Sequence, residues 1–582
     1  MSNLRSLFNP SAVAVGLLSM AGASMAEDVS TLGMRLGAVT HFSQGWNLSL
    51  VPEAKELGVH SVRDSIAWRL VEPAKHQYNF ENPRVSYVAR VAAAEVSLVL
   101  VVNSFNPNYD EGLTPYTSEG REALANFVLE TLNRFPEIKT VEIGNEFNGK
   151  NFVKGPVREA PYSERDDYYF EILRTVYERV KPARPDVSVL GGATHSVPVD
   201  YLSEMFSLGA LDFMDGVAIH PYTSTAEDLG AQLAMLRKAM GDKQRDIYIT
   251  EFGTGSPQPG VVPAYMLKFV SVMSAHKVKA AYWYALMRQK WFPDMELVDQ
   301  HGRPSTAGEA FRFIQEQLLA NGDGVDVSPD DFSYAFQFGQ HAMVLWGEPR
   351  QVKFMVPVEV YDATGTPVPT FSGRLDPDRP VIIKSGEALI MGETVQLAPT
   401  DLVGDSYHQF HLPGSVDAGK DLAGKWSYFA RGTSGEPRKL SVIGGGQRNN
   451  EPWIPYVGVP RLRPLMITSE GVNPAAFGKE GDRRREWSTV ERFTVPADMT
   501  VRIVGEWNVS DKSEDGAALT VLHNGAELHS GPIGDKSNKY KLKLDLDNVA
   551  VKAGDQIDFI VGVGSTARGR HLTNRRIQIF RR

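Results

Sequence analysis

The sequence predicts an α/β fold, a (β/α)8 barrel of the TIM type, followed by a small antiparallel β domain and a C-terminal β-sandwich of jelly-roll type. From Gly33 to Leu319, short β-rich runs alternate with amphipathic helical patterns. Eight strand–helix repeats over about 290 residues are typical of such a barrel. Beyond Gly322 the helical patterns stop, and short alternating strands separated by turn residues take over. That change indicates antiparallel sheets.

The eight predicted barrel strands are short runs rich in Val, Ile, Leu and aromatic residues. They are Met34–Val39, Ser61–Ile66, Val96–Val102, Thr140–Ile143, Val187–Gly192, Gly216–Ile219, Ile247–Thr250 and Ala280–Tyr284. Apolar side chains at helical spacing lie between them. Ser224 and Glu227 predict a capping box for the helix after the sixth strand. The last barrel helix is predicted at Pro304–Leu319, with its proline in the first turn.

The second half of the chain is predicted to hold two β domains, at residues 322–399 and 400–582, after a barrel domain at 27–321. The first contains predicted strands Ser333–Phe338, Ala342–Trp346, Gln351–Val356, Val358–Tyr361 and Val381–Lys384. In the last domain, Asn524-Gly525 between two strand-like runs predicts a tight hairpin. Carbohydrate binding is one function that such a trailing β domain could serve.

Residues 1–26 resemble a cleaved signal peptide. One charge, Arg5, precedes an apolar run at Ala12–Met20, and small residues at Ala21–Ala26 offer a cleavage site. We therefore expect a periplasmic or secreted protein, with a tethering tail as the alternative. The chain has no cysteine, which excludes disulfides and thiolate metal sites. No later apolar run is long enough to predict a membrane span.

The charge of the chain is unevenly distributed. From Asp401 to Arg582 there are 26 Lys and Arg against 22 Asp and Glu, which leaves −13 for the rest of a chain of net charge −9. Basic side chains gather in Arg461-Leu-Arg463, in Arg483-Arg-Arg485 and in a tail that ends at Arg582. These side chains either form ordinary solvated surface or attract an acidic polymer.

Polar and aromatic residues follow the predicted barrel strands near one register. In strand order they are His41, Arg63 with Trp68, Asn103, Asn145 with Glu146, His195, His220 with Tyr222, Glu251 and Trp283. The C-terminal strand ends of a parallel barrel converge on one cleft, where such barrels carry their chemistry. Further out, Trp46, Phe105, Tyr109 and Trp291 either line the same cleft or cap the barrel.

The barrel resembles clan A of the glycoside hydrolases, most closely family 39, which includes exopolysaccharide-degrading members, and then family 5. In that clan an Asn-Glu pair after strand four supplies the acid/base and a Glu after strand seven the nucleophile. The resemblance therefore implies these roles for Glu146, after Asn145, and for Glu251. Positions recurrent in the clan are matched by Arg63, Asn103, His220, Tyr222 and Trp283. Gly144 departs from the clan, where many relatives carry a bulky side chain.

Two carboxyls about 5–5.5 Å apart perform retaining hydrolysis when one is protonated and the other ionised. Arg63 and Tyr222 are expected to keep Glu251 ionised. Glu146 is expected to hold the proton, with a pKa raised by burial and by the charge of Glu251. Asn145 is expected to bond the 2-hydroxyl of the sugar.

The remaining predicted substrate contacts are His41, Arg63, Asn103, His195, His220, Tyr222 and the apolar face of Trp283.

The predicted function is hydrolysis of β-glycosidic bonds in a poly- or oligosaccharide, which could be acidic, without cofactor, metal or nucleic-acid partner. Two alternatives stay open. One is a carbohydrate-binding or polymer-handling protein with an inactive barrel. The other is a metal-dependent barrel hydrolase that uses His41, His195 and His220. His41 and His195 could also be purely structural.

Overall fold

The structure is a computed structural model. It describes residues 33–582 except 104, 255–259, 291, 293, 414–424, 434–435, 447–451, 463–464, 477–485, 511–512, 514, 535–539 and 565–570. The predicted signal peptide, Trp291 and the basic stretch Arg483-Arg-Arg485 lie outside the described residues.

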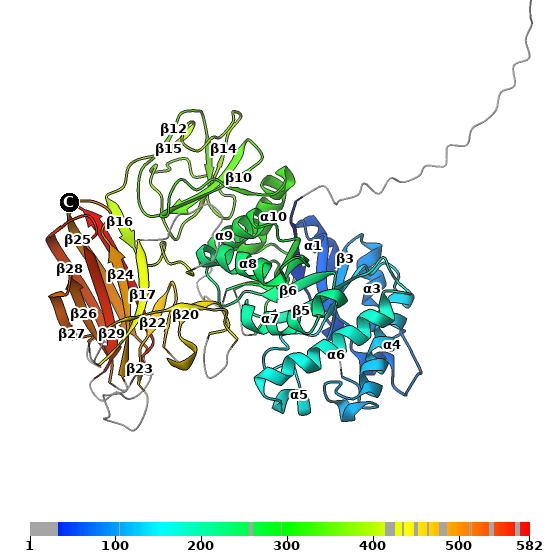
Figure 1. Cartoon of the computed structure of the whole chain (residues 1–582). Helices are drawn as coiled ribbons and strands as arrows, with labels where there is room; N and C mark the ends of the chain where they lie inside the picture. The colour runs from blue at the N-terminus through cyan, green and yellow to red at the C-terminus, as the bar shows by residue number, and fades with distance from the viewer. Residues whose placement is uncertain are drawn as a thin grey trace, which may run out of the picture.

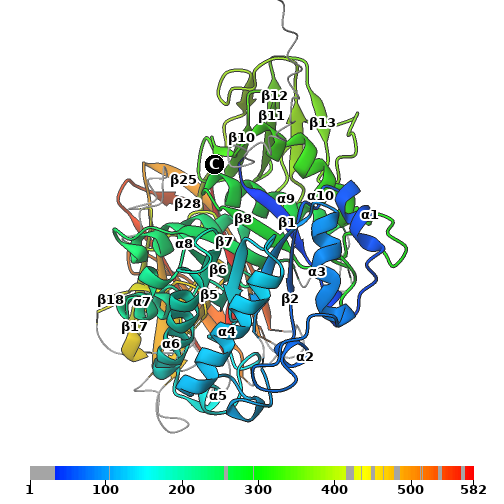
Figure 2. The same cartoon turned by 90° about the vertical axis from the view of Figure 1, so that its right-hand side faces the viewer.

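Eight parallel strands close into a barrel in chain order, which confirms the predicted fold class (Figures 1 and 2). The strands are β1 Arg35–Val39, β2 Ser61–Ser65, β3 Ser97–Val102, β4 Thr140–Ile143, β5 Ser188–His195, β6 Gly216–His220, β7 Asp246–Phe252 and β8 Ala280–Trp283. Small and aromatic side chains, among them Ala218, Tyr248 and Tyr282, fill the barrel interior. The interior is therefore a packed core, and the site lies at its mouth.

Helices surround the barrel on its outer face (Figure 2). They are α1 Leu50–Glu56, α2 Trp68–Val71, α3 Pro83–Ala93, α4 Ser118–Arg134, α5 Pro156–Glu159, α6 Tyr162–Val180, α7 Val199–Ser207, α8 Ala226–Met240, α9 Val261–Ala275 and α10 Thr306–Gln317. The last helix begins two residues later than predicted, because the side chain of Ser305 caps it by accepting from the Gly308 amide. Within the described ranges, no helix combines the length and apolarity needed to cross a membrane.

Antiparallel sheets follow the barrel, as predicted. The first sheet has the order β13-β14-β11-β10-β9, and β12 pairs with β15 beside it. These strands are β9 Val325–Asp326, β10 Ser333–Phe338, β11 Ala342–Gly347, β12 Val352–Phe354, β13 Glu359–Tyr361, β14 Val381–Lys384 and β15 Val395–Leu397. In Figure 1 this part stands above the barrel, over α9 and α10.

Two larger antiparallel sheets form the C-terminal part, with one buried core that includes Trp426, Trp507 and Phe559. Their longer strands are β16 Leu402–Asp405, β17 Trp426–Gly432, β24 Glu486–Thr494, β25 Met499–Val509, β26 Ala517–His523, β27 Ala526–Pro532, β28 Lys541–Val551, β29 Gln556–Val563 and β30 Thr573–Arg581. The shorter ones are β18 Arg438–Lys439, β19 Ser441–Ile443, β20 Tyr456–Gly458, β21 Met466–Ile467, β22 Gly471–Asn473 and β23 Ala475–Ala476. The Asn524-Gly525 hairpin is confirmed: β26 pairs with β27, and both turn residues have positive φ, 49° and 85°.

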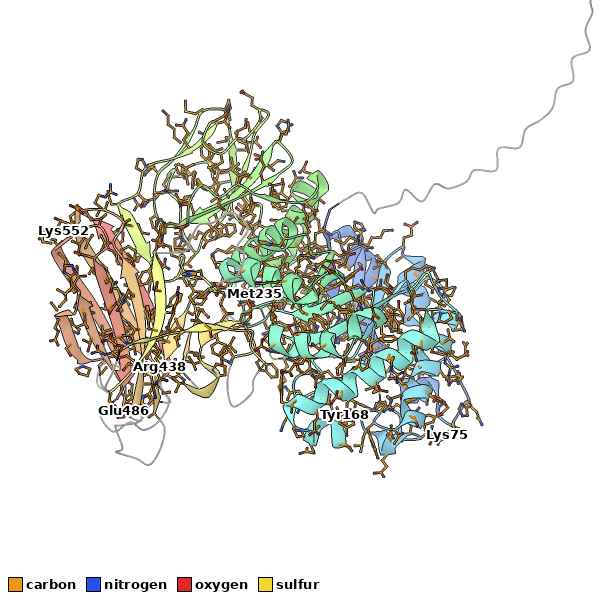
Figure 3. All side chains as sticks on the ribbon, viewed as in Figure 1. Lys75, Tyr168, Met235, Arg438, Glu486 and Lys552 are labelled. Atoms are coloured by element: carbon orange, nitrogen blue, oxygen red, sulfur yellow. The ribbon has the colours of Figure 1, made fainter. Side chains whose placement is uncertain are left out.

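Helix α8 joins the barrel to both β regions. Met235, labelled in Figure 3, packs against the barrel core and the C-terminal core. The predicted capping box at the start of α8 is wrong, because Thr225 is the cap and accepts from the Asp228 amide. Glu227 instead accepts from the indole of Trp346 at 3.0 Å and the hydroxyl of Tyr407 at 2.9 Å. A buried carboxylate that needs donors thus ties the three regions together.

Candidate active site

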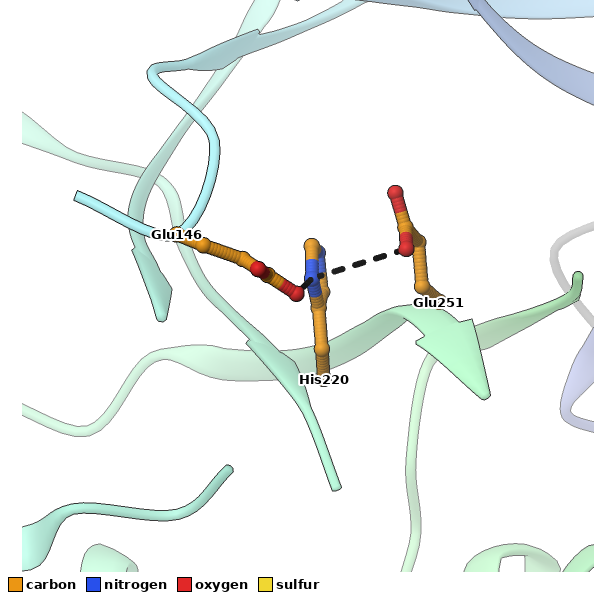
Figure 4. Close-up of side chains that lie close together, drawn as sticks. All are labelled: Glu146, His220 and Glu251. Atoms are coloured by element: carbon orange, nitrogen blue, oxygen red, sulfur yellow. Dashed lines mark hydrogen bonds and ion pairs between the residues drawn. The ribbon is translucent and has the colours of Figure 1, made fainter. Parts of the chain in front are cut away.

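Glu146 and Glu251 meet over the mouth of the barrel. Glu251 is the penultimate residue of β7, and Glu146 lies three residues after β4. One carboxylate oxygen of each and a ring nitrogen of His220 all lie within 4.8 Å of one another (Figure 4). Inverting glycosidases separate their carboxyls by about 6.5–9.5 Å to admit a water between them. The separation here falls on the retaining side of that division.

Arg63 is the central cation of the site. It is 3 % exposed and donates to three side chains. Its Nε bonds Glu142 at 2.6 Å, one Nη bonds Asn145 at 2.8 Å, and the other Nη pairs with Glu251. The Tyr222 hydroxyl donates to the second oxygen of Glu251 at 2.8 Å. Both oxygens of Glu251 therefore accept hydrogen bonds, which fixes the orientation of the carboxylate.

Glu142, inside β4, is fully buried, and it balances the charge of Arg63. Burial alone would raise the pKa of Glu142, but the charge of Arg63 and the contact with His220 lower it to about 2. Thr250 donates to Glu142 at 2.9 Å and bonds His220 Nε2 at 3.0 Å. Because the Thr250 proton goes to Glu142, its oxygen accepts from His220, and Nε2 carries a proton.

The other ring nitrogen of His220, Nδ1, lies 3.1 Å from Glu146. Burial opposes the imidazolium, but the charge of Glu251 and the contacts with Glu142 and Glu146 raise the pKa of His220 to about 9. The expectation of a raised pKa at Glu146 is wrong for the unliganded site. Burial alone would raise the pKa of Glu146, but the hydrogen bond from His220 and its charge lower that pKa below its usual value. Glu146 and His220 thus share one proton.

A tight turn after β4 aims Asn145 and Glu146 into the mouth. Gly144 has φ of 85° and Glu146 has φ of 45°, both in the left-handed region. A Cβ at Gly144 would lie 3.0 Å from the ring of Tyr169, whose hydroxyl donates to the Ile143 carbonyl at 2.7 Å. The left-handed backbone and the nearby Tyr169 ring therefore disfavour a bulky side chain at residue 144.

Trp283 does not lie at the mouth, contrary to the sequence-based expectation. It is fully buried, stands edge-on to Phe252 at 5.1 Å and donates to the Met295 carbonyl at 2.7 Å. Strand alternation places Trp283 in the core against the helices, and the next residue, Tyr284, at the mouth. The ring of Tyr284 lies 6.5 Å from Tyr222 and 5.9 Å from His41.

One ring nitrogen of His41 is available to a substrate at the site. Its Nε2 is buried and has no hydrogen-bond partner among the described residues. Its Nδ1 lies 3.1 Å from the amide nitrogen of Gln44, which donates to it. Burial lowers the pKa of His41, against the charge of Glu251. A neutral ring with an acceptor at Nδ1 presents an N–H at Nε2, suited to a substrate oxygen.

His195 sits at the rim, where the C-terminal part reaches the barrel. Its Nδ1 bonds the hydroxyl of Ser196 at 2.8 Å, and its ring lies 6.1 Å from that of Tyr222. Trp453, from the segment before β20, places its ring 6.2 Å from His195 and 5.7 Å from Tyr162. The C-terminal region therefore contributes an aromatic side chain to the mouth of the barrel.

Asn103 is not brought into hydrogen-bond contact with either glutamate in the described structure. It lines a separate cavity of about 330 Å³ beside the mouth, together with Trp68 and Phe105. The three histidines of the metal alternative do not converge either. Within the described ranges, the groups with convergent ligand atoms are Glu146–His220–Glu251 and Glu348–Asp405–His408, and Arg576 pairs with the second.

Five residues near the site were missed from the sequence: Glu142, Thr250, Tyr284, Trp453 and Asn148. Glu142 could have been found, because a carboxylate inside an apolar strand needs a buried partner, and Arg63 offers one on β2. Asn148, which bonds the backbone of His195 in both directions, has no comparable signal. Trp453 lies in a loop, 170 residues beyond the last strand of the barrel in the sequence. Only the packing of the folded chain shows that it contacts the site.

Comparison with known proteins agrees with this geometry. Residues 178–311, which include β5 to β8, match the family model "Glycosyl hydrolase catalytic core". In fold the chain is similar to a family 39 glycoside hydrolase from the gut symbiont Bacteroides cellulosilyticus WH2, with TM-score 0.51 and 19 % identity over 61 % of this chain and 81 % of that chain.

Two other solved structures have lower scores. A GH39 β-xylosidase from Caulobacter crescentus has TM-score 0.42 and 15 % identity over 61 % of this chain and 96 % of that chain. A GH5_18 protein from Bifidobacterium longum subsp. infantis has TM-score 0.40 and 15 % identity over 49 % and 79 %. No curated protein matches the chain significantly. The predicted resemblance is thus confirmed: the closed barrel carries, over residues 178–311, the sequence pattern of a glycosyl hydrolase catalytic core.

Proposed function

We propose that this protein is an exported retaining glycoside hydrolase that cleaves β-glycosidic bonds in a polysaccharide by double displacement. The observation that carries the proposal is the approach of Glu146 and Glu251 within 4.8 Å, with separate partners for each carboxyl. The match of residues 178–311 to a glycosyl hydrolase catalytic core supports it. Export rests on the sequence of residues 1–26.

In the first step, Glu251 attacks the anomeric carbon and the bond to the leaving oxygen breaks. Arg63 and Tyr222 hold the two oxygens of Glu251, so the nucleophile is oriented before the substrate arrives. The leaving oxygen takes a proton from Glu146. A glycosyl ester on Glu251 results, and the charge of Glu251 is lost as the ester forms.

The proton shared by Glu146 and His220 makes Glu146 both acid and base. In the free site the imidazolium of His220 donates to Glu146 through Nδ1. A substrate that excludes water and covers the pair favours the neutral form, with the proton on Glu146. In the second step a water gives its proton to Glu146 and its oxygen to the anomeric carbon, which releases Glu251 and restores the pair.

The sugar that reacts is held by groups already oriented in the free site. Asn145 accepts from Arg63 through its side-chain oxygen, so its amide nitrogen is left to donate to the sugar 2-hydroxyl. His41 offers the N–H of its unpartnered Nε2. Tyr284, instead of Trp283, provides the aromatic face beside the ring of the sugar.

The stereochemistry of the product tests the proposal. A panel of aryl β-glycosides and polysaccharides is incubated with the full chain, and the anomer released is followed by proton NMR before it mutarotates. The expected first product is the β-anomer. Release of the α-anomer would contradict the retaining mechanism. Binding of glycans without turnover would instead support a carbohydrate-binding protein with an inactive barrel.

The pH profile of kcat/KM is expected to report the pair formed by Glu146 and His220. The pair keeps its proton at pH values below the raised pKa of His220, about 9, so activity falls as the pH rises through about 9. In His220→Asn the proton is held by Glu146 alone, and the alkaline limb is expected to move to lower pH. His60→Asn, an exposed histidine, is the control. An unchanged alkaline limb in His220→Asn would rule out the shared proton.

Trp453 is expected to contribute to binding of extended substrates. Trp453→Ala should raise KM for a long oligosaccharide about three- to tenfold, because one aromatic contact is worth roughly 0.5–1.5 kcal/mol. Hydrolysis of a small aryl glycoside should be unaffected, and Trp453→Phe should retain binding. Trp487→Ala, a half-buried tryptophan of β24, is the matched control. An equal loss with both kinds of substrate would mean that Trp453 only braces the rim.

A further inference from the structure

Residues of the loops after β2, β3 and β4 line an open cavity of about 330 Å³ beside the mouth of the barrel. Its lining includes Ser65, at the end of β2, and Asn103, directly after β3. Ser65 is two residues beyond Arg63, which holds Glu251, so the cavity begins next to the candidate active site. Ligand pockets start at about 300 Å³, so this cavity has the size for a small unit of a larger ligand.

Two cations line this cavity, Arg69 from α2 and Lys154 from the loop after β4. In the part of the chain that the structure describes, neither forms an ion pair with a carboxylate, although residues 1–400 carry a net charge of −13. Other exposed cations of the barrel are either paired, as in Lys75 with Glu119, or without a carboxylate partner among the described residues, as in Arg84 and Arg90, but those two do not line this cavity. The cavity therefore has positive charge left for a ligand.

Two acidic residues of the segments around this lining, Glu72 and Asp110, have their carboxylates engaged elsewhere. Glu72 accepts from the indole of Trp68 at 2.6 Å and from the hydroxyl of Tyr109 at 2.7 Å. Asp110 accepts from the hydroxyl of Thr117 at 2.7 Å. Their oxygens are satisfied by these donors, so they are not oriented to neutralise the two cations.

The walls of the cavity are aromatic and held in place. The Trp68 ring is stacked on Tyr109 at 5.2 Å and on Phe127 at 5.7 Å. The Lys154 ammonium lies 4.3 Å from the centre of the Phe105 ring, a cation–π contact.

The backbone around Lys154 is also fixed. The Lys154 amide donates to the hydroxyl of Thr114 at 2.8 Å. Gly155 has φ of 61°, and a Cβ there would lie 2.6 Å from the side chain of Leu113. The position of the lysine is thus set by close packing that only glycine permits.

We propose that this cavity is a subsite for a sugar unit that carries an anionic substituent, so that the substrate is an acidic polysaccharide. The inference rests on the proposed glycosidase function and deepens it. Arg69 and Lys154 bind the carboxylate or sulfate group by charge-assisted hydrogen bonds, Asn103 bonds a hydroxyl, and Phe105 offers a ring face. Neutral sugars lack the group that these two cations recognise.

Binding to an inactive full-length protein tests the subsite apart from hydrolysis. The Glu251→Ala protein is titrated with uronic-acid oligosaccharides, with the same oligosaccharides after reduction of their carboxyl groups, and with sulfated and neutral ones. Tighter binding of the acidic forms is expected, and it should weaken at high salt. The carboxylated and sulfated arms identify which anion is bound.

Adding Arg69→Gln and Lys154→Gln to that protein is expected to raise Kd for acidic oligosaccharides about tenfold or more and to leave neutral ones unchanged. The control adds Arg90→Gln and Lys353→Gln, which remove two exposed cations outside the cavity. An equal effect of the control pair, equal affinity for reduced and acidic oligosaccharides, or no binding of any acidic oligosaccharide would overturn the proposal.

Hydrolysis by the wild-type chain, with both cations intact, separates this proposal from the proposed function. If neutral glycans are cleaved with retention and acidic ones are not, the result supports the proposed hydrolase function and contradicts the acidic subsite. If acidic glycans bind through Arg69 and Lys154 but no glycan is cleaved, the result supports the acidic subsite and contradicts the proposed hydrolase function.

Discussion

Glu251→Ala is expected to lower the rate of glycoside hydrolysis by about 10⁴-fold or more, since loss of a catalytic nucleophile removes the covalent route altogether. The space left by the carboxylate lies between Arg63 and Tyr222, two donors that now have no anion to hold. Azide fits such a space and can attack an activated aryl β-glycoside there. The expected product is the α-glycosyl azide, formed by a single displacement with inversion.

The fold of this variant should survive, because Arg63 keeps its bonds to Glu142 and Asn145 and is not left as an unpaired buried charge. Circular dichroism and thermal unfolding check this point. Glu527→Ala, an exposed glutamate of β27, is the control for a generic loss of a carboxylate. Full hydrolytic activity of Glu251→Ala, or a β-glycosyl azide as product, would exclude Glu251 as the nucleophile.

The barrel and the two glutamates could be predicted from sequence because both follow from periodic patterns. Hydrophobic runs mark the strands, and barrel geometry carries whatever follows each strand to one mouth. The same patterns do not show which face of the last barrel strand each side chain takes, and the prediction therefore places Trp283 on the wrong face. One residue along a strand reverses the direction of the side chain, so Tyr284 and not Trp283 reaches the mouth.

Long-range pairing is what the sequence does not encode in any local pattern. Glu142 and Arg63 are 79 residues apart, and Trp453 meets His195 from a different region of the chain. The pKa of Glu146 depends on the same kind of contact. Burial and the negative charge of Glu251 both predict a raised pKa, but His220 lies at 3.1 Å and reverses the direction. Only the three-dimensional arrangement shows which neighbour dominates.

Glu146→Ala is expected to behave differently from the nucleophile variant, in a way that depends on the leaving group. With a polysaccharide, whose leaving oxygen needs a proton, the rate should fall by about 10²–10⁴-fold. With a dinitrophenyl glycoside, which departs without a proton, the first step survives. The second step, in which Glu146 would activate water, then limits turnover. Both kcat and KM are therefore expected to fall for the activated substrate.

Azide separates the two carboxyls by the configuration of the product. In Glu146→Ala the nucleophile Glu251 is intact, so azide attacks the glycosyl-enzyme and gives the β-glycosyl azide, with net retention. In Glu251→Ala the same anion gives the α-product. Opposite anomers from two variants whose carboxyls lie within 4.8 Å of each other cannot arise from a general loss of structure.

Glu146→Gln sharpens the assignment, because glutamine keeps the size and a hydrogen-bond partner for His220 Nδ1 but cannot exchange a proton. If the pair shares a proton, Glu146→Gln should lose the alkaline limb that the wild-type profile shows near the pKa of His220, about 9, while activated substrates still form the glycosyl-enzyme. Retention of that limb in Glu146→Gln would transfer the role of acid to His220. The pH profile thus distinguishes a glutamate that delivers the proton from a histidine that delivers it directly.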